Sequence, residues 1–311
     1  MQNIAFLFSG QGAQAAGMGK SLYESSPAAR AVFDLADHVL GRPISELCFS
    51  GPQEQLNLTR NTQPCMLAVD LAAHAAARET GIRPSAVAGF SLGEYAALAA
   101  AEVIALEDAF RIIQLRADAM QDAVPVGMGA MAAVKLGAEE AGTLCGEVEG
   151  YVVPANINSP VQTVVSGEAE AVDRLLVIAK EQKIKAVKLP VSAPFHCALM
   201  EPARARLEKA LQGIPFHHAA VPIYMNVDGT AHRDAGDIRQ CVLQQTVSPV
   251  RWTDTICRMD ADLGCAFVEL GAGKTLCSLV KKIQADAVAM HIEDAATLSA
   301  CAEEIRGRLE N

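Results

Sequence analysis

The sequence predicts an α/β fold with a mainly parallel sheet, into which a smaller subdomain is inserted. Two observations carry this prediction. Apolar runs of strand length alternate with longer segments of helical period along most of the chain, whereas a block near its middle has the order β-α-β-β-α-β. Nearly continuous apolar strands that alternate with helices are typical of a parallel sheet covered on both faces.

Five apolar runs predict the strands of the parallel sheet. They lie at residues 4–8, 86–90, 221–227, 266–270 and 287–292. Two segments between them, residues 63–79 and 105–123, repeat apolar side chains with a helical period, and we expect them to cover the sheet as helices.

The block from 126 to 192 predicts the inserted subdomain. A strand ("GMGAMAAVKL"), a helix ("GAEEAGTLCGEV") and two adjacent strands ("YVVPANI" and "PVQTVVSG") are followed by a second helix and a last strand. This is the ferredoxin-like order of elements. We therefore predict a discontinuous large α/β domain, residues 1–125 and 193–311, and a small ferredoxin-like subdomain, residues 126–192.

The composition excludes several classes of protein. Of 311 residues, 51% are hydrophobic and 20% are charged, so the chain can bury a large core and is not expected to be disordered. No apolar stretch approaches the ~20 residues of a membrane span, and the N-terminus lacks the basic region of a signal peptide. The net charge of −10 disfavours nucleic acid and anionic membranes as partners.

The nine cysteines indicate a reducing compartment. Their number is odd, and they are scattered without a C-x-x-C motif or a histidine at metal-ligand spacing. This pattern argues against a disulfide framework and against structural zinc. We expect free thiols, no metal site and a cytoplasmic protein.

The stretch "VAGFSLGEYAALAAA" predicts a nucleophilic serine. Gly89 and Gly93 flank Ser91 between an apolar strand and an alanine-rich helix. A nucleophile elbow requires this order, because its sharp turn excludes bulky neighbours and the helix N-terminus stabilises developing negative charge. The alternative is a loop in which the serine only caps a helix.

A serine nucleophile needs a base, and His196 in "SAPFHCALMEPA" is one candidate, at a junction between a loop and a helix. On the residues alone, an ordinary surface or core histidine stays possible. Six further histidines compete with it: His38, His74, His217, His218, His232 and His291. An α/β-hydrolase would also place an acid between the serine and the histidine in the chain. The acidic residues there, such as Asp118, Glu139 and Asp173, fall in predicted helices or in the subdomain, which weakens a simple hydrolase interpretation.

Two further segments carry candidate site residues. In "FLFSGQGAQ" a tight turn follows the first strand, and the backbone N–H of Gln11 can join that of Leu92 as an oxyanion hole, or the segment is an ordinary β-turn. In "RIIQLRADAMQ", Arg116 follows Leu115 at the border of the apolar face. It is either a helical arginine whose charged end reaches solvent or a bidentate clamp for a carboxylate.

Four segments together resemble one family: "FSGQGAQ", "GFSLGEYAAL", "QLRADAMQ" and "PFHCALM", with "SPVQTVVSG", "MNVDG", "QTVSPVRW" and "ELGAGKTL" in the same order as in that family. The chain is similar from end to end to the malonyl-CoA:acyl carrier protein transacylases of fatty acid synthesis, whose fold the acyltransferase domains of polyketide synthases share. The resemblance implies a hydrolase-like α/β core with a ferredoxin-like insert.

The resemblance also implies roles for site residues. Ser91 becomes malonyl-serine, His196 is the general base, and the backbone N–H groups of Gln11 and Leu92 form the oxyanion hole. Arg116 holds the malonyl carboxylate, whose charge cannot be buried unpaired. A backbone carbonyl near Gln245 orients the histidine, which accounts for the missing acid.

In the predicted acyl pocket, one residue agrees with the family pattern and another departs from it. Phe195 resembles the family variant associated with malonyl, whereas Phe90 stands where most members have histidine, so both are candidate residues of the acyl-specificity pocket. Asn158 and Asn226 match polar positions of the family's cleft, without an assigned role.

The implied reaction is ping-pong transfer of malonyl from malonyl-CoA to the phosphopantetheine thiol of acyl carrier protein, by a monomer without cofactor. An acidic carrier would need a basic patch, and two groups of lysines are candidates, although both can be ordinary solvated side chains: Lys180, Lys183, Lys185 and Lys188, or Lys281 and Lys282. The alternatives are an acyltransferase of a polyketide pathway, a serine thioesterase, or a catalytically silent scaffold that binds carrier protein.

Overall fold

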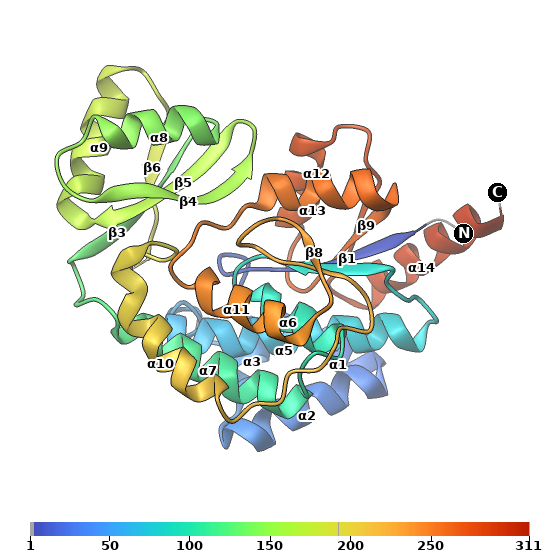
Figure 1. The fold of residues 1–311 in the computed structure, drawn as a ribbon. Helices are drawn as coiled ribbons and strands as arrows, with labels where there is room; N and C mark the ends of the chain where they lie inside the picture. Colours follow the sequence, from blue (N-terminus) through green and yellow to red (C-terminus); the bar gives the residue numbers. More distant parts are fainter. Residues whose placement is uncertain (1–2, 192, 311) are drawn as a thin grey trace.

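Two β-sheets organise the chain in the computed structural model, which describes residues 3–191 and 193–310 (Figure 1). The larger sheet has the strand order β10-β9-β1-β2-β7-β8, and every neighbouring pair is parallel except β7 and β8. Its strands are β1 (Ile4–Phe8), β2 (Ala86–Gly89), β7 (Ile223–Tyr224), β8 (Ala231–His232), β9 (Ala266–Leu270) and β10 (Ala289–Ile292). The predicted mainly parallel sheet is therefore confirmed.

The observed strands differ from the predicted runs mainly at β7. The run at 221–227 predicts a strand of seven residues, but β7 contains only Ile223–Tyr224. Beyond it, the backbone N–H of Asn226 donates to the side chain of Glu94, so it is not available for a sheet partner. The chain then turns and returns as β8, a short strand that the sequence did not predict.

Helices pack on both faces of the large sheet. Phe6 and Phe8 of β1 belong to one hydrophobic core, whereas Ala5 and Leu7 belong to the core on the opposite face, as the alternation of side chains along a strand requires. The helices of this domain are α1 (Lys20–Ser25), α2 (Pro27–Leu40), α3 (Ile44–Ser50), α4 (Gln53–Leu56), α5 (Thr59–Glu79), α6 (Gly93–Ala100), α7 (Leu106–Asp122), the 3₁₀ turn η1 (Ala198–Met200), α10 (Glu201–Leu211), α11 (Ala235–Gln245), α12 (Trp252–Leu263), α13 (Thr275–Ile283) and α14 (Ala295–Glu310). None of the helices in the described part of the chain has the length and apolar character needed to cross a membrane.

The smaller sheet has the antiparallel order β4-β5-β3-β6 of a ferredoxin-like fold. Its elements are β3 (Gly129–Val134), α8 (Ala138–Gly146), β4 (Val152–Ser159), β5 (Gln162–Glu168), α9 (Ala169–Glu181) and β6 (Ala186–Lys188). All of them lie within the predicted range 126–192, whose last residue is outside the described residues. Helices α8 and α9 lie together on one face of this sheet in Figure 1.

The other face of the small sheet packs against the large domain. Met131 of β3 and Val164 of β5 form a hydrophobic cluster with Met120 of α7 and with Phe195. The site described next lies at this junction.

Candidate active site

Ser91 lies in a sharp turn between β2 and α6. Its φ of 53° falls in the left-handed region, which residues other than glycine adopt only when their surroundings enforce it. A Cβ on Gly89 would lie 2.0 Å from the backbone of Gly93, and one on Gly93 would lie 2.3 Å from the carbonyl oxygen of Phe8. Both flanking glycines are therefore required for this geometry, as the elbow motif predicts.

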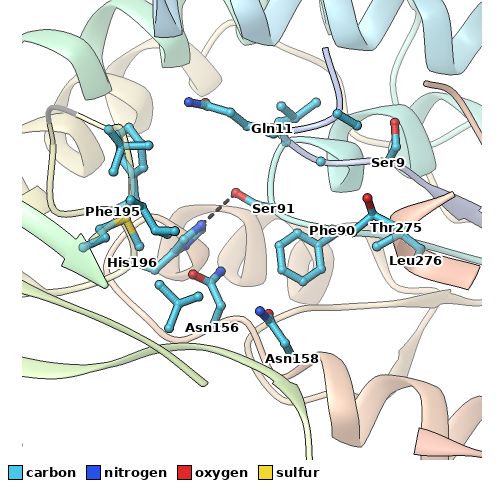
Figure 2. Close-up of a pocket in the computed structure, with 18 of the residues that line it drawn as sticks. Ser9, Gln11, Phe90, Ser91, Asn156, Asn158, Phe195, His196, Thr275 and Leu276 are labelled. Atoms are coloured by element: carbon cyan, nitrogen blue, oxygen red, sulfur yellow. Dashed lines mark hydrogen bonds between the residues drawn. The ribbon is translucent and has the colours of Figure 1, made fainter. Parts of the chain in front are cut away.

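His196 is hydrogen-bonded to this serine. Its Nε2 is 2.7 Å from Ser91 Oγ (Figure 2), and its Nδ1 is 2.9 Å from the carbonyl oxygen of Gln245. Because a carbonyl can only accept, Nδ1 carries the proton and Nε2 offers its lone pair to the serine hydroxyl. Burial, reinforced by the positive charge of Arg116, lowers the pKa of His196 from 6.5 to about 4. The imidazole is therefore a neutral base at neutral pH.

Arg116 is 1% exposed and reaches the same serine from α7. Its Nη2 donates to Ser91 Oγ at 3.3 Å and to Gln245 Oε1 at 2.9 Å, and its Nη1 donates to Gln63 Oε1 at 2.7 Å. Its Cζ lies 5.2 Å from the ring centroid of Tyr95. These partners are all uncharged, so the guanidinium can still bind an anion directly beside the serine.

A cavity of about 320 Å³ opens over these groups, between the two domains. Every side chain predicted for the site lines it except Gln245, which is fully buried behind it. The small subdomain contributes the facing wall: Met131, Ala133, Asn156, Asn158, Gln162 and Val164. In Figure 2, Asn156 and Asn158 lie across the cavity from Gln11.

The two phenylalanines lie on different sides of the cavity. Phe90 packs edge-on against Trp252, with ring centroids 5.3 Å apart and an interplanar angle of 70°. A Cβ on Gly10 would come within 2.8 Å of Phe90, so this ring also lies against the turn that contains Gly10 and Gln11. Phe195 packs among the apolar residues at the domain junction. Their influence on the choice of acyl group stays a prediction.

Gln11 and Leu92 both line the cavity beside Ser91. Helix α6 begins directly after Leu92, so the positive end of its dipole lies next to the serine. This position is compatible with an oxyanion hole, and the role of these two backbone N–H groups stays a prediction.

Two residues of the site were not predicted from the sequence, and a third had no assigned role. Gln63 accepts from Arg116, and Glu94 lies fully buried below Ser91. Asn226 accepts from the backbone N–H of Ser91 at 2.9 Å and donates to the carbonyl of Gly89 at 2.7 Å, so it holds both sides of the elbow. The available signal was a polar residue inside an otherwise apolar segment, which applies to Glu94 but not to Gln63, since the residues directly before Gln63 are polar.

The two groups of lysines that are candidates for carrier docking lie on different elements. Lys188, on the edge strand β6, pairs with Asp173, which offsets its charge. Lys281 and Lys282 lie in the last turn of α13. A docking role for either group stays a prediction.

One group of potential metal ligands occurs among the described residues, outside the cavity. Ligand atoms of Asp228, His232 and Cys241 lie within 4.8 Å of one another. The Nε2 of His232 is 2.8 Å from Asp228 Oδ2 and 3.2 Å from Thr230 Oγ1, so the histidine is hydrogen-bonded without an ion.

Comparisons with known proteins agree with this geometry. The model of the acyl transferase domain family matches residues 5–304. A malonyl CoA-acyl carrier protein transacylase of Bacillus subtilis (strain 168) is 40% identical over 316 residues, which cover all of both chains. One of Escherichia coli (strain K12) is 39% identical over 309 residues, which cover 97% of this chain and 100% of the other.

Solved structures are also similar. The structure of the malonyl CoA-acyl carrier protein transacylase from Coxiella burnetii has a TM-score of 0.94 at 38% identity and covers 97% of each chain. A malonyl-transacylase solved in complex with its type II PKS acyl-carrier protein has a TM-score of 0.93 at 40% identity, covering 97% of this chain and 99% of the other.

Proposed function

The chain belongs to the acyl transferase domain family, and we propose that it transfers the malonyl group from malonyl-CoA to the phosphopantetheine thiol of an acyl carrier protein in fatty acid biosynthesis. Relatives named for this activity match over the whole chain, and a similar transacylase has been solved with its carrier protein. The observation that carries the choice of acyl group is the buried guanidinium of Arg116, 3.3 Å from Ser91 Oγ.

In the first half-reaction, Ser91 Oγ attacks the thioester carbonyl while His196 Nε2 takes its proton. The carbonyl of Gln245 stabilises the resulting imidazolium through Nδ1–H. The backbone N–H groups of Gln11 and Leu92 stabilise the oxyanion. The intermediate then collapses, the C–S bond breaks, and the imidazolium returns its proton to the sulfur of CoA. Because the pKa of His196 is lowered, its protonated form is a strong proton donor to this leaving group.

In the second half-reaction, His196 takes the proton of the carrier thiol, and the thiolate attacks the carbonyl of the malonyl-serine ester. The ester C–O bond then breaks, and the imidazolium returns the proton to Ser91 Oγ. Both half-reactions consist only of acyl transfer and proton transfer, so the proposed chemistry needs no cofactor. The apolar side chains that line the cavity, including Phe90, Phe195 and Met120, disfavour water between the two steps. We also propose that this reaction takes place in the cytoplasm.

The acyl group is selected by charge. A malonyl carboxylate pairs with Arg116, whereas an acetyl group leaves the buried guanidinium without a counter-ion. The same machinery would serve an acyltransferase of a polyketide pathway, and the solved complex with a type II PKS carrier keeps that alternative open.

The test is direct observation of the acyl-enzyme. The protein is incubated with malonyl-CoA, and intact mass spectrometry is expected to detect one malonyl adduct that maps to Ser91. The adduct should be absent in Ser91→Ala and present in Ser278→Ala, a control at an exposed serine of α13. Holo carrier protein should then discharge the adduct with formation of malonyl-carrier.

Other results would overturn the proposal. An adduct that persists in Ser91→Ala excludes the assigned nucleophile. Rapid hydrolysis of malonyl-CoA without carrier protein would identify a thioesterase. Parallel assays with carrier proteins of fatty acid and polyketide synthesis decide between the two pathways.

A further inference from the structure

Glu94 is a fully buried carboxyl group that the mechanism above does not use. It lies in the first turn of α6, three residues after the nucleophile. Its Oε2 accepts from the backbone N–H of Asn226 at 2.7 Å, and its Oε1 accepts from Gln245 Nε2 at 3.0 Å. Both oxygens therefore accept hydrogen bonds from N–H groups.

The contact with Gln245 fixes the direction of an amide that faces Arg116. The Nε2 of Gln245 lies near three acceptors: Glu94 Oε1, the carbonyl of Ser91 at 2.9 Å and Asn226 Oδ1 at 3.4 Å. Its Oε1 is thereby turned toward Arg116 and accepts from Nη2 at 2.9 Å. A reversed amide would place its NH₂ group against the guanidinium, where two donors repel each other.

Burial decides the charge state of Glu94. Arg116 and Glu94 are both buried, and the side chains that contact Arg116 directly are neutral. Burial raises the pKa of Glu94 to about 8, against the N–H of Asn226, the charge of Arg116 and the amide of Gln245, which all lower it. Asp228 adds a smaller raising effect on this pKa. At neutral pH the raised pKa leaves Glu94 largely protonated, so what it supplies toward Arg116 is the direction of the Gln245 amide and not a counter-charge.

We propose that Glu94 is a positioning residue for acyl selection: through the Gln245 amide it holds the Arg116 guanidinium beside Ser91. This inference rests on the proposed function, because it concerns recognition of the malonyl carboxylate. Two consecutive hydrogen bonds, from Gln245 to Glu94 and from Arg116 to Gln245, connect the first turn of α6 to the cavity.

The test compares loading rates with malonyl-CoA and acetyl-CoA in single-turnover mass spectrometry. Glu94→Gln keeps the shape but turns one acceptor oxygen into an NH₂ donor, so Gln245 loses its fixed direction. We expect the malonyl-to-acetyl rate ratio to fall about 100-fold, the scale of a misplaced or unpaired recognition group. Glu94→Asp retains two acceptor oxygens and should keep the ratio within about fivefold of wild type.

This ratio separates positioning from mere structural support. A destabilised enzyme loses active molecules for both substrates equally, so its ratio does not change. Glu102→Gln is the matched control, because this glutamate follows α6 but its side chain is 66% exposed. It should leave both rates within about twofold of wild type, as surface substitutions usually do.

A second variant tests the link itself. Gln245→Met removes the side-chain amide but retains the backbone carbonyl that holds His196, so it should lower the ratio as Glu94→Gln does. In the double variant the two losses should not add, because they interrupt the same chain of contacts. If Glu94→Gln fails to fold, an unchanged ratio in Gln245→Met still overturns the proposal, as does an unchanged ratio in Glu94→Gln.

Failure of the proposed function gives a different result. In that case wild-type enzyme forms no malonyl adduct at all, and the positioning role is measured by nuclear magnetic resonance instead. The side-chain NH₂ of Gln245 should exchange slowly with solvent in wild type and faster in Glu94→Gln. Equal exchange in both would overturn the role of Glu94.

Discussion

The cavity has two walls of different construction. The catalytic wall comes from the large domain. Ser91, Arg116 and His196 line the cavity, and hydrogen bonds connect them to residues that lie buried behind them: Glu94, Asn226 and Gln245. The subdomain wall is the wall that faces it from the small sheet: Met131, Ala133, Asn156, Asn158, Gln162 and Val164. On this second wall, the Oδ1 of Asn158 is buried without a hydrogen-bond partner.

We infer that the catalytic wall performs the reaction, whereas the subdomain wall mainly shapes the cavity. The hydrogen-bonded groups of the catalytic wall depend on one another, although Arg116 Nε is itself buried without a partner. One change there leaves another group unpaired at a cost of roughly 1–3 kcal/mol. Apolar contacts of the subdomain wall are non-directional and tolerate change more readily. We expect substitutions to have large effects on the first wall and small effects on the second.

The largest effect is expected at Arg116. In Arg116→Met, the rate of loading from malonyl-CoA should fall about 1,000-fold, whereas loading from acetyl-CoA should fall little or rise, because only malonyl needs a counter-ion. Competition between the two substrates, read by mass spectrometry of the acyl-enzyme, measures this effect. Arg111→Met is the control, since Arg111 lies on the same helix with a side chain 60% exposed. Equal losses for both substrates would contradict the role of Arg116.

Asn226→Ala should have the next largest effect. It leaves the N–H of Ser91 and the carbonyl of Gly89 without their partner in the elbow. We expect the free energy of unfolding to fall by about 2–4 kcal/mol, the cost of two unsatisfied buried groups, and malonyl loading to fall at least about tenfold. Urea denaturation and single-turnover loading measure the two quantities, with the exposed Asn57→Ala as control. Unchanged stability would mean that the elbow holds its shape without this side chain.

The elements of the catalytic wall differ in how far the sequence reveals them. Ser91 is visible because its glycines and its strand-to-helix context are local, and the fold follows from apolar periodicity over neighbouring residues. Arg116 and His196 were ambiguous from the residues alone, since a helical arginine and a single histidine have many ordinary explanations. Resemblance to a family resolved them, and the distances to Ser91 agree with it.

Glu94 and Asn226 could not be assigned from the sequence. The partners of Glu94 lie 132 and 151 positions away in the chain, and Asn226 is 135 and 137 positions from Ser91 and Gly89 of the elbow. No periodicity encodes such contacts, because tertiary packing alone brings these segments together. The same applies to the end of β7, which the N–H of Asn226 determines.

Acid should lower the stability of the protein, in part through His196 of the catalytic wall. His196 is buried as a neutral group with its pKa lowered to about 4, whereas in the unfolded chain its pKa is close to 6.5. Between these values the unfolded state binds more protons, so stability is fully present above pH 6.5 and is lost as the pH falls toward 4. At pH 5.5 this histidine alone should lower the free energy of unfolding by about 1 kcal/mol relative to pH 7.5.

Urea denaturation from pH 4.5 to 7.5 measures this slope. His196→Gln should reduce it, and His74→Gln should also reduce it, since burial likewise lowers the pKa of His74 to about 4. Asn156→Ala, on the subdomain wall, carries no titratable group and should leave the slope unchanged. An identical slope in wild type and His196→Gln would show that the histidine is not buried in its neutral form.

The smallest effect is expected at Asn158, and it tests the comparison most strictly. Asn158→Ala removes a buried oxygen that has no partner, so the free energy of unfolding should stay the same or rise by up to about 1 kcal/mol. Malonyl loading should stay within about threefold of wild type, because no catalytic side chain depends on this amide. A loss of more than about tenfold in loading would mean that the amide binds substrate. The small subdomain would then take part in recognition, and the division into a wall for chemistry and a wall for shape would no longer hold.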